Sequence, residues 1–243
     1  MSEFPPPIRL PGEPRPPAEP YESHRRGEPS PVVDDDVDVF GAEAAAAGLA
    51  DRLAHVQPHA ARLADDGEPL LSPPFTRGRD RIEGPATPRT SLVVFGAHGT
   101  SSSRRLGEVL ERIRLRDLTS VGVAWRHYPD PAAHPRAAVL ALAAEAAAVR
   151  GRFWVLTREL LRMRHDDPAD LHAALVRAGL DPGGTLETMR AGTGADRIAD
   201  DVASALASGV TFAPTLFVDG ERYRGELEPD AVLAALEAAA ARP

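Results

Sequence analysis

The stretch SLVVFGAHGTSSSRRLGEVLERIRL, residues 91–115, decides the fold class. Its first five residues form an apolar run, rich in β-branched side chains, that predicts a buried strand. Apolar residues then recur at helical spacing, at Leu106, Val109, Leu110 and Ile113. This spacing predicts a helix with one face on a core. A strand that turns directly into a helix start is typical of α/β folds, and the free N–H groups there stabilise anions.

The composition excludes several function classes. The chain has 243 residues, of which 43% are hydrophobic, which is enough for one sizeable domain and extra segments. A net charge of −8 disfavours nucleic acid and anionic membranes as partners. Cysteine is absent, and this excludes structural disulfides, thiolate metal sites and cysteine nucleophiles.

No apolar run approaches the roughly 20 residues that span a bilayer. The first residues, MSEFPPPIRLPGEPRPP, lack the apolar core of a signal peptide. We therefore expect no membrane span and a soluble protein located in the cytoplasm.

The chain before the central stretch divides into three parts. Residues 1–41 are rich in Pro, Glu and Asp, which predicts a disordered arm. Residues 42–66 predict a helical segment from Ala42 to Asp65 with a break before Pro58, and residues 67–88, with several prolines, a linker or a wrapping arm. His55 and His59 have the spacing of paired metal ligands, but no third ligand is evident and we expect surface histidines and no metal site.

The chain after the central stretch returns to a strand, then to helices, then to strands. Residues 118–128 alternate like a second strand, and residues from about 134 to 208 have a helical pattern throughout. Residues 214–218 predict a third strand, and Asp219-Gly220 is a hairpin signal of type I′. A final alanine-rich helix follows Glu228. The order is β-α-β, a helical block, then β-β-α.

This order resembles the DsbA-like branch of the thioredoxin superfamily over about residues 79–241. The segments that carry the resemblance are DRIEGPATPRTSLVVFG at 80–96, WRHYP at 125–129, HP at 134–135, GRFW at 151–154 and DVASALASGVTFAPTLFVDGERYRG at 201–225. They are similar to the thioredoxin domains fused to some bacterial sodium/proton antiporters. The resemblance implies a thioredoxin-like α/β domain over residues 89–243, with an all-helical insertion at about 134–208.

The resemblance also implies where the site lies. Thr100 stands where the family has its nucleophilic cysteine, and Ser103 where it has the resolving cysteine. Pro214 stands at the family's cis-proline, and Ala213 before it would offer main-chain groups to an extended peptide. Dithiol exchange needs two thiols, so this chain cannot perform it alone.

The hydroxyls at the helix start have two interpretations. In the first, serine and threonine only cap helix N–H groups and replace cysteines of similar size, so the site is an inactive remnant of a redox site. Alternatively, Thr100 or Ser101 could donate a hydrogen bond to the thiolate of a bound low-molecular-weight thiol. His98 could tune the site or carry a proton, but we expect a solvent-exposed loop residue. Ser102 completes the candidate binding residues.

Two functions follow from these observations. The first is a redox-inactive module that binds an extended peptide or protein partner in a groove at Pro214. The second is a transferase or isomerase that depends on a thiol cofactor and uses Thr100 or Ser101. We favour the first, which needs no cofactor.

Overall fold

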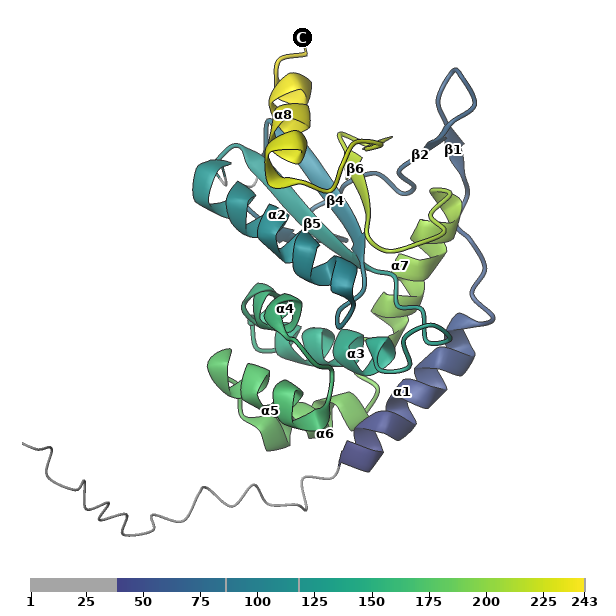
Figure 1. The fold of residues 1–243 in the computed structure, drawn as a ribbon. Helices are drawn as coiled ribbons and strands as arrows, with labels where there is room; N and C mark the ends of the chain where they lie inside the picture. Colours follow the sequence, from purple (N-terminus) through teal and green to yellow (C-terminus); the bar gives the residue numbers. More distant parts are fainter. Residues whose placement is uncertain (1–38, 86, 118, 243) are drawn as a thin grey trace, which may run out of the picture. The chain divides into compact units, whose positions relative to one another are not determined.

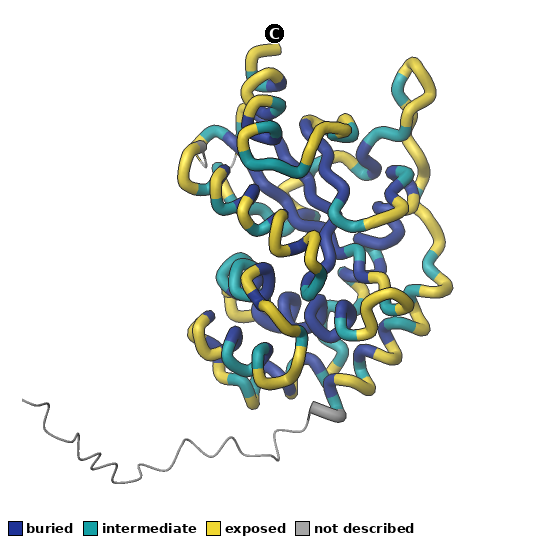
Figure 2. The backbone as a smooth tube through the Cα atoms, viewed as in Figure 1, coloured by how far each residue is buried: buried dark blue, intermediate teal, exposed yellow. Residues whose placement is uncertain are grey.

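Two parallel strands form the centre of the fold (Figure 1). They are β4 (Thr90–Gly96) and β5 (Val121–His127), and helix α2 (Ser101–Asp117) connects them. Every residue of both strands is buried, as the dark blue tube in Figure 2 shows. A computed structural model describes residues 39–242, apart from residues 86 and 118. The predicted β-α-β start is confirmed.

A five-stranded sheet grows from this pair. Its other strands are β3 (Arg81–Glu83), β6 (Thr215–Val218) and β7 (Glu221–Arg222), in the order β3-β5-β4-β6-β7. All neighbours except β4 and β5 are antiparallel. Asp219 and Gly220 join β6 to β7 with φ angles of 47° and 86°. Both angles are positive, as a type I′ turn requires, so the predicted hairpin is confirmed.

Helices cover both faces of the sheet (Figure 1). Helix α2 and helix α8 (Pro229–Ala240) contact each other, and α8 also contacts β4. Helix α7 (Ala195–Ala207) packs on β5 from the other face. Because side chains alternate along a strand, Val93 and Phe95 both point toward one of these cores. The members of that core cluster are Leu71, Val93, Phe95, Ala124, Ala205, Val210 and Phe217.

The helical block lies between β5 and β6 in the sequence. It contains α3 (Ala137–Ala148), α4 (Phe153–Arg162), α5 (Pro168–Arg177), α6 (Pro182–Arg190) and α7. Asp167 and Asp181 cap the starts of α5 and α6, each followed by a proline at the first helical position. The predicted all-helical insertion is therefore confirmed, with its helices between Ala137 and Ala207.

The segment before the central strands differs from the prediction. Helix α1 (Val39–Leu53) packs against α3 and α6 and ends shortly before the predicted break at Pro58, but residues 58–65 form no helix. Pro58 favours an extended residue before it, and the chain then forms a small hairpin of β1 (Arg62–Leu63) and β2 (Pro69–Leu70). The predicted linker at 67–88 contributes β3 to the sheet, so it is more than a linker. Most of the predicted disordered arm, residues 1–38, lies outside the described residues.

No helix in the described part of the chain combines the length and the apolar character that a membrane crossing requires.

Candidate functional site

Thr100 and Ser103 bond to each other at the start of α2. The Thr100 N–H donates to Ser103 Oγ at 2.8 Å, and the Ser103 N–H donates to Thr100 Oγ1 at 3.1 Å. The two hydroxyl oxygens are 2.8 Å apart. This reciprocal pattern satisfies two N–H groups that a helix start otherwise leaves open. Ser103 is buried, whereas Ser101 and Ser102 are exposed.

His98 lies inside the protein, so the expectation of an exposed loop residue is wrong. Its side chain stacks on the Trp125 indole at 4.6 Å between ring centroids, and 1% of the residue is exposed. Neither ring nitrogen has a hydrogen-bond partner in the described residues. Burial, together with the nearby His127, lowers the pKa of His98 well below its usual 6.5. The sequence missed this burial because Trp125 comes from a different strand.

A buried charged network continues from His98 and escaped the sequence analysis. The His127 ring lies 6.0 Å from the His98 ring, and its Nε2 is 3.2 Å from the Glu145 carboxylate. Arg81 of β3 donates to the same carboxylate through Nε at 3.3 Å and Nη2 at 2.5 Å. Burial would raise the pKa of Glu145, but the hydrogen bonds from His127 and Arg81 outweigh it and lower the pKa to about 2. The sequence signal that could have indicated this network is Glu145 itself, the single charged residue in the alanine-rich α3.

The neutral state of His98 predicts a pH-dependent stability. An unfolded histidine binds a proton below about pH 6.5, whereas folded His98 resists protonation. Lowering the pH below about 6.5 should therefore reduce the free energy of unfolding, by up to about 1.4 kcal/mol per pH unit. His98→Phe keeps a ring on Trp125 and should flatten this slope between about pH 7 and about pH 5. Urea unfolding at several pH values measures it.

The matched control for this prediction is His134→Asn, which changes an exposed histidine. It should leave the slope as in the natural protein. The range stays above pH 4.5, since the lowered pKa of Glu145 adds its own loss of stability only below that value. An unchanged slope in His98→Phe would contradict the prediction.

Ala213 and Pro214 lie at a cavity of about 540 Å³, and the peptide bond between them is cis. Ser102, from the first turn of α2, lines the same cavity, whereas Thr100 and His98 do not. The other lining residues come from the β6 approach, β7 and the loop after it: Phe212, Thr215, Leu216, Arg222, Tyr223, Arg224, Gly225 and Leu227. The structure thus brings together three of the predicted site residues.

The main chain of Ala213 is open to a partner. Within the described residues, no group bonds to its N–H or its C=O. The next main-chain positions are occupied, since Thr215 pairs with Phe95 of β4 and the Phe212 C=O accepts from the Thr215 hydroxyl at 2.8 Å. An unpaired donor and acceptor at the rim of a cavity can bond an extended chain.

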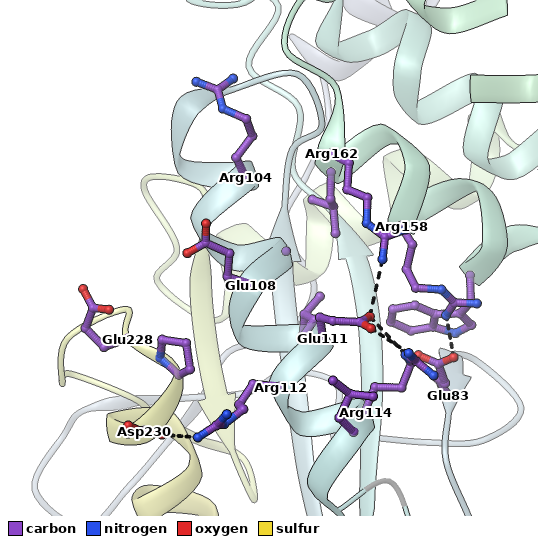
Figure 3. A pocket seen from close by; sticks show the side chains of 16 residues that line it. Glu83, Arg104, Glu108, Glu111, Arg112, Arg114, Arg158, Arg162, Glu228 and Asp230 are labelled. Carbon is purple, nitrogen blue, oxygen red and sulfur yellow. Dashed lines mark hydrogen bonds and ion pairs between the residues drawn. The ribbon is translucent and has the colours of Figure 1, made fainter. Parts of the chain in front are cut away.

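A larger cavity of about 760 Å³ lies between α2, α4 and the start of α8 (Figure 3). Five arginines and five carboxylates line it, and most of them form ion pairs across it. Examples are Arg158 with Glu83 at 2.6 Å and Arg112 with Asp230 at 3.3 Å. An ionic ligand would have to compete with these pairs. None of the predicted site residues lines this cavity.

Two residues named in the sequence analysis, Phe153 of the GRFW segment and His59, make contacts elsewhere in the fold. Phe153 is buried beside His127. His59 pairs with Asp200 at 2.9 Å, and the part of the chain that the structure describes holds no cluster of three metal ligands.

The fold matches known structures closely enough to define its class. BdbD from Bacillus subtilis aligns with a TM-score of 0.60 and 16% identity, over 70% of this chain and 98% of that chain. Wolbachia pipientis alpha-DsbA1 aligns with a TM-score of 0.57 and 13% identity, over 68% and 93%. The chain is therefore a cysteine-free protein with the DsbA-like thioredoxin fold.

Proteins related in sequence share more identical residues with this chain than these structures do. The Na⁺/H⁺ antiporter NhaA 3 of Salinispora tropica is 37% identical over 196 residues, which are 79% of this chain and 29% of that protein. The Na⁺/H⁺ antiporter NhaA 1 of Mycolicibacterium gilvum is 33% identical over 168 residues, 68% and 27%. The chain thus spans less than a third of these relatives. No family model matches the sequence.

Proposed function

We propose that this protein is a binding module without dithiol chemistry that holds an extended peptide or protein segment beside Pro214. The observation that carries the proposal is the unpaired main chain of Ala213 at the rim of a 540 Å³ cavity. A bound segment adds hydrogen bonds there without displacing any, because the Ala213 N–H and C=O have no partner within the described residues. The absence of cysteine supports the lack of dithiol activity.

The thiol-cofactor alternative has less support. Neither Thr100 nor Ser101 lines the cavity, and the Thr100 hydroxyl is engaged with Ser103. A thiolate held by Thr100 would have to compete with this bond. The cytoplasmic location remains a prediction, and any link to sodium or proton transport rests on the relatives alone.

The experiment is an NMR titration of the isotope-labelled chain with a short unstructured peptide. We expect chemical-shift changes concentrated at Ser102 and around Ala213. The same peptide N-methylated along its backbone should bind more weakly, since it cannot donate hydrogen bonds to the Ala213 C=O.

Two further titrations make the result decisive. Glutathione replaces the peptide in the first, and shifts confined to Thr100 and Ser101 would favour the thiol-cofactor function. In the second, Arg116→Gln serves as a surface control far from the cavity and should bind the peptide as the natural chain does. Shifts confined to the helical block would count against the proposal.

A further inference from the structure

The cavity beside Pro214 has an uneven charge. Two arginines line it, Arg222 and Arg224, and no aspartate or glutamate does. The chain as a whole carries a net charge of −8, so a basic lining is a local departure from the average. A cavity with one sign of charge attracts the opposite sign.

Arg222 is the arginine available to a ligand. No carboxylate pairs with it among the described residues; its Nη1 donates to the Gly209 C=O at 3.0 Å. A guanidinium has five N–H donors in a planar fork, so most of its donors remain for a partner. Arg224 differs, because it already pairs with Glu68.

Phe212 gives the same cavity an apolar surface. It is 59% exposed, and the Arg222 guanidinium lies 5.6 Å from the centre of its ring. This cation–π contact holds the guanidinium in place beside an exposed ring. The Arg222 guanidinium therefore suits a carboxylate, and the exposed Phe212 ring beside it suits an apolar side chain.

The start of α2 strengthens the preference for an anion. Ser102 of its first turn lines the cavity, and a helix N-terminus carries a partial positive charge. Among the described residues, the N–H groups of the exposed Ser101 and Ser102 have no main-chain partner, as is usual at a helix start.

We propose that the groove beside Pro214 selects extended segments that carry an acidic side chain next to an apolar one. The carboxylate bonds to Arg222 and the apolar side chain packs on Phe212, while the main chain pairs with Ala213. This inference rests on the proposed peptide-binding function and adds the chemistry of the peptide. It predicts that basic segments are rejected, since their charge would face Arg222 without a partner.

The test compares three peptides on the full chain by calorimetry at low salt. Their sequence is SGAEFAGS, with Gln or Lys in place of Glu in the second and third. We expect the Glu peptide to bind about tenfold more tightly than the Gln peptide, as a charge-assisted hydrogen bond allows, and the Lys peptide most weakly. The preference should shrink at high salt.

Variants of the protein test which residue causes the preference for the Glu peptide. Arg222→Gln should lose most of the preference for the Glu peptide over the Gln peptide, and Arg222→Lys should keep more of it through its charge. Arg112→Gln is the matched control, since Arg112 lines the larger cavity. It should leave the preference unchanged. The thermal midpoint of each variant shows that it is folded.

The outcomes separate the inference from the function on which it rests. If the natural chain binds all three peptides equally, the inference fails and the peptide-binding function stands. If the preference survives in Arg222→Gln but disappears in Arg112→Gln, the carboxylate is bound in the larger cavity and the inference is wrong. If no peptide binds at all, both fail.

Discussion

Replacing Thr100 and Ser103 by cysteine is expected to give the protein dithiol activity that the natural chain lacks. The two hydroxyl oxygens are 2.8 Å apart, and the longer Cβ–S bonds of cysteine let two sulfurs approach the roughly 2.05 Å of a disulfide. The helix N-terminus lowers the pKa of a cysteine there, which favours the reactive thiolate. We expect the double variant to catalyse disulfide exchange measurably and the natural chain, which has no cysteine, to give no catalysis.

Two measurements check this result. Mass spectrometry after mild oxidation should show the loss of two hydrogens, and turbidity should report the reduction of insulin by dithiothreitol. The single variant Thr100→Cys is the control: it can form mixed disulfides but has no second thiol to resolve them. A folded double variant that forms its disulfide and yet stays inactive would show that the groove no longer accepts a protein substrate.

The second large effect is expected at Asp80, which holds a fully buried arginine. Both Asp80 and Arg126 have side chains with 0% exposure, and their two hydrogen bonds measure 2.8 and 3.1 Å. Asp80→Asn leaves the Arg126 charge without its counter-ion. We expect a loss of about 3–5 kcal/mol in the free energy of unfolding, a large share of the stability of a typical domain.

Urea denaturation with matched m-values measures this loss. The control is Asp230→Asn, which removes an exposed partner of Arg112 and should change the free energy of unfolding by less than about 1 kcal/mol. A similarly small effect of Asp80→Asn would mean that the main-chain acceptors of Arg126, at Pro73 and Pro74, suffice to hold the charge.

The central strands and α2 were predictable because their signals are local. The apolar run of β4 and the helical spacing of Leu106 and Ile113 each fit one element, and both are buried as the pattern requires. The Asp219-Gly220 turn is equally local. Strand β3 has only three residues, and no periodicity can be read from so short a segment. Its place in the sheet depends on pairing with β5.

The sequence named candidate site positions but said nothing of their surroundings. The family motif placed Ser102, Ala213 and Pro214, and the structure brings them to one cavity. The burial of His98 depends on Trp125, and the proposed role of Arg222 depends on its place beside Phe212 in the folded chain, so neither has a local signature. A histidine in a Gly-rich turn resembles a surface residue until Trp125 covers it.

The edges of the sheet bear on how the protein avoids self-association. An edge strand exposes unpaired main-chain groups that can recruit a strand from another molecule, and proteins guard against this with short, charged edges. Here β3 has three residues and β7 has two, and their sequences, RIE and ER, are mostly charged. Like molecules therefore find little to pair with at either edge, and the sheet resists growing into β-aggregates.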